Sequence, residues 1–222
     1  MYVHGSAAMG GFVPSRSDVD VLAVCARHLA AEEKTAVAHE LSESRLPCPG
    51  VGLELSVITR ETAREPAGDA PPFELHAATA ADEPKVVDGT RGSGDPDLLA
   101  HVAMTRAAGI AVLGPEPAGV FGPVPRRALL RSSAEDLQWA LDRGTHAYAV
   151  LNACRAMRFL DEDAVCSKIE GASWALARGA DPHVIEAALA RQRGADVAPN
   201  PQAAKAFVQS IRAALLAAAE QA

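Results

Sequence analysis

The sequence predicts an α+β protein with two domains: a mixed sheet with flanking helices in residues 1–122, and an all-α helical bundle in residues 123–222. Two patterns predict this division. Short β-prone apolar runs, separated by Gly and Pro turns, lie in the first part, and almost every segment after Pro125 is helix-prone. The length of 222 residues also exceeds the ~100–200 residues typical of one domain, which favours two.

The first domain is predicted to begin with strands and one amphipathic helix. Strands are expected at residues 2–4 and 19–24, and a helix is expected between Ala30 and Ser44, before two prolines. In residues 51–59 (VGLELSVIT), apolar and polar side chains alternate, which is the pattern of a strand with one polar side. These elements supply the first three strands of the predicted sheet.

The rest of the chain is predicted to be mostly helical. Residues 73–77 favour a short strand, residues 82–96 a loop rich in Gly, Asp and Pro, residues 97–108 a helix, and residues 109–113 a brief apolar strand. Beyond residue 125, Gly, Asp and Pro breaks separate five expected helices, at residues 128–141, 145–160, 167–177, 182–191 and 202–219.

Composition excludes several classes of protein. The chain is 49% hydrophobic and 22% charged, with no apolar run near the ~20 residues that a membrane span needs. No basic segment precedes an apolar stretch at the N-terminus, so we expect a cytoplasmic protein without a secretory signal. The four cysteines are widely spaced and form no C-x-x-C pair, so we interpret them as ordinary thiols.

The net charge indicates the kind of partner. A formal charge of −7 disfavours a nucleic-acid surface, which usually needs a concentrated positive stripe. We therefore expect a monomer that acts on a small, cationic molecule, with neither a nucleic-acid nor a membrane partner.

One short segment carries the pattern of a metal and phosphate site. A glycine turn at Gly5-Ser6 is followed by Asp18 and Asp20, spaced i, i+2 so that both carboxylates face the same side of a strand. Like charges this close repel unless a cation lies between them, and Mg²⁺ is usually held by one or two carboxylates plus substrate phosphates. The alternative is a solvated polar face at a strand edge, which an isolated D-x-D pair more often is.

Glu54 adds a third carboxylate on the polar side of its predicted strand. It is expected either to join the metal ligands or to accept a proton. In nucleotidyl transfer, a metal offsets charge on the leaving diphosphate while a carboxylate accepts the proton of the attacking hydroxyl. The segment therefore contains a candidate for each part of that reaction.

These residues resemble a known signature. Gly5-Ser6, Gly10-Gly11 and Ser17-Asp18-Val19-Asp20 are similar to the signature of the nucleotidyltransferase superfamily, and later segments are similar to the aminoglycoside adenylyltransferases that modify streptomycin and spectinomycin. The later similarities are Leu53-Glu54-Leu55-Ser56-Val57, Leu113-Gly114-Pro115, Phe121-Gly122-Pro123-Val124-Pro125, Val150-Leu151, Arg155, Lys168 and Trp174. The resemblance implies a nucleotidyltransferase-type mixed sheet followed by a helical C-terminal domain.

The resemblance also implies a role for each residue. Magnesium would be held by Asp18 and Asp20, which with Glu54 as general base form the catalytic set. ATP, the co-substrate, would be bound through its phosphates by Gly5, Ser6, Ser17, Arg155 and Lys168. The alternative for Arg155 and Lys168 is that they are solvated helix residues. Family members usually have a helix before the first strand, which here begins beside Met1, and trimming there would affect folding or activity.

The sequence says least about the acceptor, the molecule that would receive the nucleotide. Drug-binding members carry an acidic residue just before the helix of Arg155, where this chain has Gly144-Thr145-His146, so Asp142 is assigned as the substrate-binding carboxylate. The absence of the usual acid leaves open an acceptor other than an aminocyclitol. Trp139 and Tyr148 are interpreted as packing residues rather than a substrate platform.

Three functional hypotheses follow. The first is a magnesium-dependent transfer of AMP from ATP to a hydroxyl of an aminoglycoside or aminocyclitol antibiotic. The second is the same chemistry on another acceptor, such as a protein hydroxyl or an RNA end. The third is a non-catalytic, antitoxin-like regulatory module that binds nucleotide. The sequence has no P-loop, and we expect His4 to be a packed strand residue rather than a catalyst.

Overall fold

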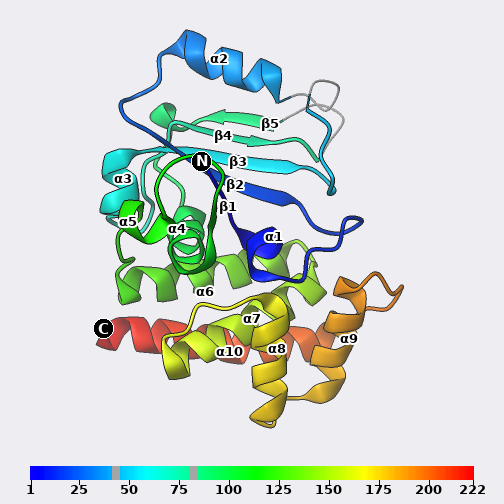
Figure 1. The fold of residues 1–222 in the computed structure, drawn as a ribbon. Coiled ribbons are helices and arrows are strands. Elements are labelled where there is room, and N and C mark those ends of the chain that lie inside the picture. The colour runs from blue at the N-terminus through cyan, green and yellow to red at the C-terminus, as the bar shows by residue number, and fades with distance from the viewer. Residues whose placement is uncertain (42–45, 81–84) are drawn as a thin grey trace. The chain divides into compact units, whose positions relative to one another are not determined.

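The chain folds as two units, residues 1–124 and residues 125–222, which are described separately below (Figure 1). The computed structural model describes residues 1–41, 46–80 and 85–222. Within these residues, unit 1 contains a six-stranded mixed sheet with flanking helices, and unit 2 is helical. The α+β fold class expected from the sequence is confirmed.

The sheet of unit 1 has the strand order β5-β4-β3-β2-β1-β6. β2 and β3 are parallel, and the other neighbouring pairs are antiparallel. Its strands are β1 (Tyr2–Val3), β2 (Val19–Cys25), β3 (Leu53–Thr59), β4 (Leu75–Ala78), β5 (Lys85–Asp88) and β6 (Ile110–Ala111). Its helices are α1 (Gly5–Met9), α2 (Ala31–Glu40), α3 (Arg60–Arg64), the 3₁₀ turn η1 (Gly89–Arg91), α4 (Asp97–Ala108) and α5 (Pro117–Val120).

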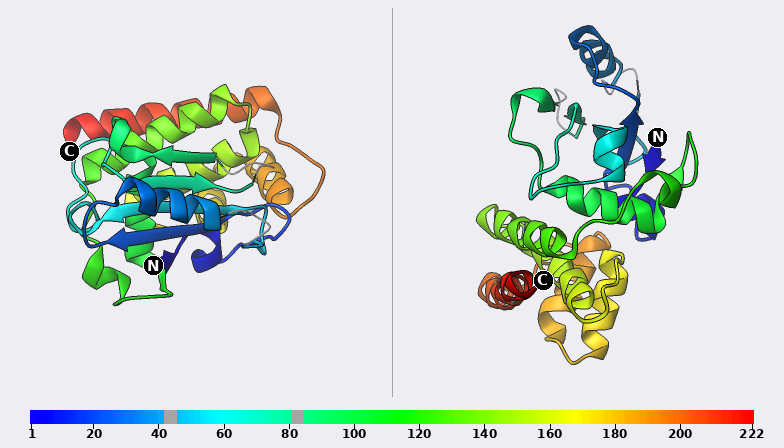
Figure 2. Two further views of the ribbon diagram at one scale, coloured as in Figure 1. Left: turned by 90° about the horizontal axis from the view of Figure 1, so that it is seen from above. Right: turned by 90° about the vertical axis from the view of Figure 1, so that its left-hand side faces the viewer.

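The two faces of the sheet pack against different helices because side chains alternate along each strand. One face carries Val21 and Leu55, which pack with Leu41 just after α2. The opposite face carries Leu22 and Ile58, which pack with Leu98 and Val102 of α4. α2 and α4 accordingly lie on opposite sides of the sheet (Figure 2).

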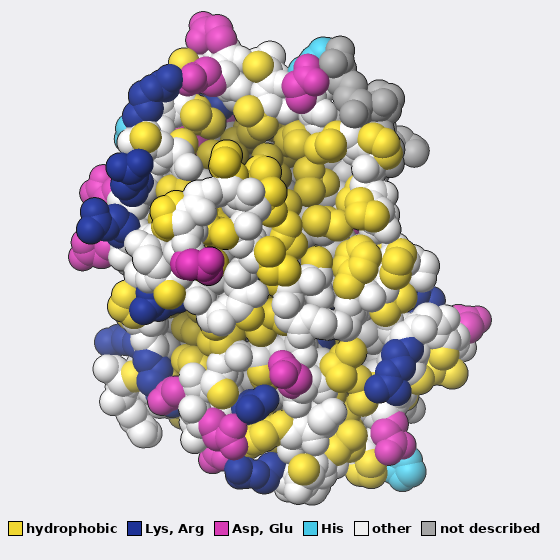
Figure 3. All heavy atoms as spheres, in the orientation of Figure 1, with side chains coloured by type: hydrophobic (Ala, Val, Ile, Leu, Met, Phe, Trp, Pro, Cys, Tyr) yellow, Lys and Arg dark blue, Asp and Glu magenta, His cyan; other side chains and the backbone are white. Residues whose placement is uncertain are grey.

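α2 leaves part of its face of the sheet uncovered. Val3, Val19, Ala23 and Leu53 on this face are only partly buried, and Ile110 of β6 is 52% exposed. Figure 3 shows hydrophobic side chains gathered over the strands of unit 1 beside α2. The strand side chains described on this face are apolar, so the candidate site must be sought on the other face.

Several predictions for unit 1 need correction. Residues 82–96 were expected to form a loop, but β5 and η1 lie there. The side chains of β5 are mostly exposed, so the strand has no apolar pattern, and its pairing with β4 decides its conformation. The strand expected at 109–113 shortens to Ile110–Ala111, and the helix expected from Ala30 to Ser44 ends at Glu40. The parts of these predictions at residues 42–44 and 82–84 lie outside the described residues.

A buried polar network fixes α2 to the edge of the sheet. Glu74, just before β4, is buried, and its carboxylate accepts hydrogen bonds from the backbone of Leu29 at 2.9 Å and contacts His28 Nδ1 at 2.8 Å. Lys34 of α2 is also buried and lies 2.7 Å from Asp88 Oδ1 and 3.8 Å from Glu74 Oε2. Burial raises the pKa of Glu74, but these partners outweigh it and hold the pKa below its usual value.

Removing this carboxylate should destabilise unit 1. Glu74→Met leaves the Leu29 amide and the Lys34 ammonium with fewer partners in a buried place, so we expect a loss of about 2–4 kcal/mol. Native-state hydrogen exchange of the β3 and β4 amides is the measurement, because both tryptophans lie in unit 2 and their fluorescence does not report on this unit.

The matched control is Arg27→Met, which removes an exposed ion pair with Glu33 at the start of α2. Exposed pairs contribute little, so exchange in the control should match that of the wild type. Equal protection in Glu74→Met and Arg27→Met would contradict a stabilising role for the buried network.

Unit 2 consists of five helices, as predicted, with ends that differ by at most two residues from the expected ones. They are α6 (Arg126–Asp142), α7 (His146–Glu162), α8 (Lys168–Ala177), α9 (Pro182–Gln192) and α10 (Pro201–Gln221). α7 buries an apolar stripe that includes Val150 and Leu151, and it packs against the other four helices. Small residues allow close packing, since a side chain on Gly171 of α8 would overlap the backbone of Arg155.

Local signals explain where these helices begin. Ser167 and Glu170 form a reciprocal capping box at the start of α8, with bonds of 3.2 and 2.8 Å. Asn200 caps α10 and is followed by Pro201, whose fixed φ suits the first helical position. In the described part of the chain, no helix is both long and apolar enough to cross a membrane. All four cysteines are free thiols, as expected.

Candidate functional site in unit 1

The candidate site starts from the pairing of two parallel strands. Asp20 is the second residue of β2 and Glu54 the second residue of β3, and the two are direct partners in the strand register. Both side chains lie on the same face as Leu22 and Ser56, two residues further along each strand. Asp18 precedes β2 by one residue and is, like Asp20, partly buried.

Gly5 brings the backbone directly against one of these carboxylates. It has a φ of +58°, a conformation that side chains rarely adopt, and a β-carbon there would overlap Asp20 Oδ2. The preceding amide, His4 N, donates to the Asp20 carbonyl at 3.0 Å. Gly5 begins the short helix α1, which also contains Ser6. The predicted glycine turn and the predicted carboxylate strand are thus in contact.

Ser17 has a structural role in this fold. It is 6% exposed, its hydroxyl accepts from Val13 N at 3.1 Å, and its carbonyl accepts from Val51 N at 2.9 Å. These bonds connect the segment before β2 to the segment before β3. They therefore hold the starts of the two carboxylate-bearing strands side by side. The prediction that Ser17 binds the cofactor is not tested by these contacts.

The carboxylates suit a magnesium ion that is completed by substrate. Among the described residues, no three His, Cys, Asp or Glu side chains form a cluster able to hold a metal. Mg²⁺ commonly takes only one or two carboxylates and completes its octahedron with phosphate and water oxygens. Because Gly5 has no side chain, its backbone can lie directly against the Asp20 carboxylate, which supports the fit of the ion to this site.

Glu54 has a histidine as its neighbour on the next strand. His76 of β4 pairs with Ser56 of β3, and its Nδ1 lies 3.0 Å from the Ser56 hydroxyl. His76 Nε2 lies 3.9 Å from Glu54 Oε1, and the Glu54 side chain is 34% exposed. No functional role was predicted for His76 or Ser56 from the sequence. An E-x-S pattern beside a strand that contains His was the available signal, but only strand pairing makes it meaningful.

A buried histidine, His4, directly precedes Gly5 and lies against His101. His4 is 2% exposed, which confirms the prediction of a packed residue, and its ring centre lies 4.9 Å from that of His101 on α4. Burial lowers the pKa of His4 well below its usual value, and His101 lowers it further. Among the described groups, Nδ1 of each ring is buried without a hydrogen-bond partner. His4 is therefore held as a neutral imidazole at physiological pH.

This burial makes stability depend on pH in a defined direction. Unfolded His4 binds a proton below about pH 6.5 while folded His4 does not, so acid favours unfolding. We expect the free energy of unfolding of unit 1 to fall below about pH 6.5, by up to ~1.4 kcal/mol per pH unit for this group. In His4→Phe the slope should flatten, as measured by hydrogen exchange of β2 amides across this pH range.

The control is His39→Gln, which removes an exposed histidine from α2. It should retain the slope of the wild-type protein. An unchanged slope in His4→Phe would show that other groups cause the acid sensitivity.

The predicted residues of unit 2 lie on α6, α7 and α8. Arg155 of α7 donates to the Cys166 carbonyl at 3.0 Å and to Asn152 Oδ1 at 3.2 Å. Lys168, the first residue of α8, places its ammonium 4.2 Å from the centre of the Tyr148 ring. Asp142, the last residue of α6, is exposed and accepts from Gln138 at 2.8 Å.

Two polar residues that contact this set, Asp136 and Asn152, were not predicted from the sequence. Asp136 accepts from Tyr148 at 3.0 Å and from Asn152 at 2.8 Å, and Asn152 in turn holds Arg155. Trp139 and Tyr148 were interpreted as packing residues, but they are 47% and 36% exposed. They interact with cations instead, because their ring faces attract Arg143 and Lys168.

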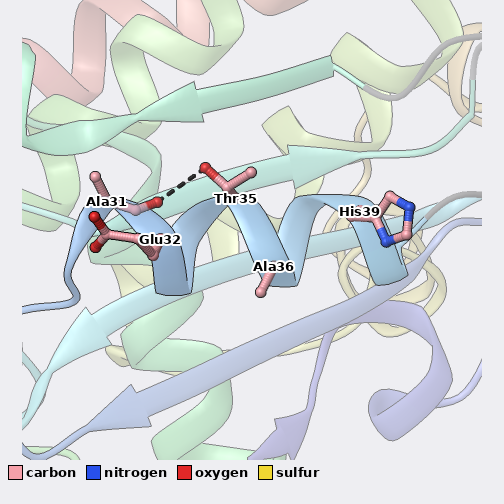
Figure 4. Close-up of a pocket in the computed structure, with 5 residues that line it drawn as sticks. All are labelled: Ala31, Glu32, Thr35, Ala36 and His39. Carbon is pink, nitrogen blue, oxygen red and sulfur yellow. Dashed lines mark hydrogen bonds between the residues drawn. The ribbon is translucent and has the colours of Figure 1, made fainter.

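Unit 1 also has a shallow hollow, which lies apart from the predicted site residues. It runs along the outer face of α2 and is lined by Ala31, Glu32, Thr35, Ala36 and His39 (Figure 4). The Thr35 hydroxyl there donates to the Ala31 carbonyl at 2.9 Å. None of the predicted catalytic or binding residues lines this hollow, so the carboxylates beside Gly5 remain the candidate site.

Comparison with known proteins gives matches to a family model and to solved structures. Residues 119–218 match the family described as aminoglycoside adenylyltransferase, C-terminal domain. The whole chain is similar to the crystal structure of spectinomycin adenyltransferase AAD(9) from Enterococcus faecialis with ATP and spectinomycin. That similarity has a TM-score of 0.70 at 16% identity and covers 96% of this chain and 90% of the other. No protein of curated function matches the sequence.

These matches define the class of protein first. The fold is that of a nucleotidyltransferase with a helical C-terminal part, and the expectation of a nucleotidyltransferase enzyme is confirmed. Within that class, residues 119–218 are similar to the C-terminal domain of aminoglycoside adenylyltransferases, in agreement with the sequence resemblance.

Proposed function

We propose that the protein transfers AMP from ATP to a hydroxyl group of a small antibiotic of the aminoglycoside or aminocyclitol type, with Mg²⁺ held by Asp18 and Asp20. The observation that carries the proposal is the register of β2 and β3. It sets Asp20 opposite Glu54, on one face of the sheet and against Gly5. The aminoglycoside adenylyltransferase domain at residues 119–218 supports the acceptor class.

The reaction follows from the chemistry of these groups. When bound, Mg²⁺ would offset negative charge on the triphosphate and on the leaving diphosphate. Glu54 would accept the proton of the acceptor hydroxyl as its oxygen attacks the α-phosphorus. The bond between the α-phosphorus and the oxygen that bridges to the β-phosphate then breaks. The products are an adenylylated acceptor and diphosphate, and the proton remains on Glu54 until solvent removes it.

The acceptor is proposed from charge and from the comparison structure. A chain with a net charge of −7 attracts cations, and aminoglycosides and aminocyclitols carry ammonium groups. The AAD(9) structure contains ATP and spectinomycin, which supports ATP as the co-substrate. The exposed carboxylate of Asp142 is the proposed contact for an ammonium group of the acceptor. Ser6, Arg155 and Lys168 stay predicted phosphate-binding residues.

The direct test is a transfer assay. The protein is incubated with ATP labelled in its α-phosphate, Mg²⁺, and a panel that contains streptomycin, spectinomycin and other aminoglycosides. Labelled antibiotic and equimolar diphosphate are the expected products. Label found on a protein or an RNA end, with none on any antibiotic, would favour the second acceptor class. Nucleotide binding with no transfer at all would favour the regulatory module.

Replacing a proposed metal ligand should abolish transfer. Asp20→Asn keeps the shape of the side chain but removes one of two charges that attract Mg²⁺, so we expect kcat/KM to fall by at least about a hundredfold. Transfer rates measured across a range of Mg²⁺ concentrations check this. The hydrogen-exchange pattern of unit 1 should match that of the wild type. Full activity in this variant would refute the assignment of the metal site.

Replacing the proposed base should separate turnover from binding. In Glu54→Gln the amide cannot accept the proton of the hydroxyl, so kcat should fall by roughly a hundredfold to ten-thousandfold while the Kd for ATP with Mg²⁺ stays near the wild-type value. Stopped-flow transfer rates and equilibrium titration with a non-hydrolysable ATP analogue measure the two quantities. A weaker Mg²⁺ affinity with an unaltered limiting kcat would instead identify Glu54 as a metal ligand.

A further inference from the structure

One imidazole connects the proposed base to a buried hydroxyl. His76 is the register partner of Ser56, and Glu54 lies two residues before Ser56 on the same face of β3. His76 Nδ1 is 3.0 Å from the Ser56 hydroxyl oxygen, and Nε2 is 3.9 Å from Glu54 Oε1. The second distance is too long for a hydrogen bond and corresponds to an electrostatic contact. The ring thus has one nitrogen directed at each neighbour.

The chemistry of the two neighbours selects one tautomer. Ser56 is 2% exposed, so its hydroxyl proton needs an acceptor within the protein, and His76 Nδ1 is within reach. If Ser56 donates to Nδ1, the ring proton lies on Nε2 and points at the Glu54 carboxylate. The opposite tautomer would set the Nε2 lone pair against a carboxylate oxygen, which is repulsive. The geometry therefore favours a neutral ring with Nε2–H toward Glu54.

The surroundings of His76 agree with a neutral ring. Burial lowers the pKa of His76, Glu54 and Asp95 oppose this effect, and His101 and Lys85 add to it. Glu54 lies on β3, Asp95 lies just before α4, His101 lies on α4, and Lys85 begins β5. These charged and titratable groups therefore face His76 from each of its neighbouring elements. A neutral ring offers Glu54 a directional N–H dipole rather than a full positive charge.

We propose that His76 is a positioning residue for Glu54, with Ser56 fixing its tautomer so that the Nε2–H dipole holds the carboxylate beside Asp20. Glu54 shares its register position with Asp20, so the two carboxylates repel and Glu54 would otherwise rotate toward solvent. The proposal rests on the proposed function, in which Glu54 accepts the hydroxyl proton. His76 acts through Glu54 and exchanges no proton with the substrate.

The kinetic test compares two replacements at the same position. His76→Gln retains an amide N–H at about the reach of Nε2, whereas His76→Met fills similar space without a donor. We expect His76→Met to lower kcat by about tenfold to a hundredfold with KM for ATP unchanged, and His76→Gln to recover most of that loss. Ser56→Ala should show a smaller loss, because the ring remains but its tautomer is no longer fixed.

The matched control is His39→Gln on α2, which should leave all constants at their wild-type values. A purely structural role for His76 predicts that Gln and Met lower activity alike, in step with lowered thermal stability. Equal kcat losses in the two variants, or wild-type kcat in His76→Met, would overturn the proposal.

A spectroscopic test needs no catalysis. In the free protein labelled with ¹⁵N-histidine, the His76 ring should show a protonated Nε2 and an unprotonated Nδ1, and Glu54→Gln should shift the Nε2 resonance. Ser56→Ala should reduce the preference for this tautomer. An Nδ1–H tautomer that is insensitive to Glu54→Gln would refute the contact. If the wild-type protein transfers AMP to no acceptor, the proposed function fails, while these resonances still decide whether His76 orients Glu54.

Discussion

The parallel pairing of β2 with β3 is the constraint on which the candidate site depends. It sets Asp20 directly opposite Glu54, with both side chains on the same face. Carboxylates at directly paired strand positions repel each other. A fold that keeps them together needs compensating groups. The proposed Mg²⁺ on Asp18 and Asp20 would be one such group, and His76 beside Glu54 is the other.

The surrounding structure serves to hold this register. Ser17 bonds to Val13 and Val51 and so joins the starts of the two strands, while Gly5 lets the backbone before α1 approach Asp20. On the opposite face, the buried network of Glu74 and Lys34 fixes α2 to the sheet edge. Rigid strands carry the carboxylates, which favours a site that is already formed before substrate binds.

Pattern recognition succeeded where the relevant information is local. The alternation of residues 51–59 placed Glu54 and Ser56 on the polar side of their strand. The capped helices of unit 2 were also predicted within two residues. Strand β5 was missed because an exposed edge strand has no apolar periodicity, and Trp139 was misjudged because helical spacing alone does not show which face is buried.

The sequence by itself determined the fold class, the order of most elements, the acidic residues of the candidate site and the resemblance to aminoglycoside adenylyltransferases, because each is encoded within a few neighbouring residues. Only the tertiary structure decided that Asp20 faces Glu54, that His76 lies between Ser56 and Glu54, and that Asp136 anchors Asn152 beside Arg155. These contacts join segments from 16 to 34 residues apart. Strand register and helix packing, which no local pattern specifies, bring them together.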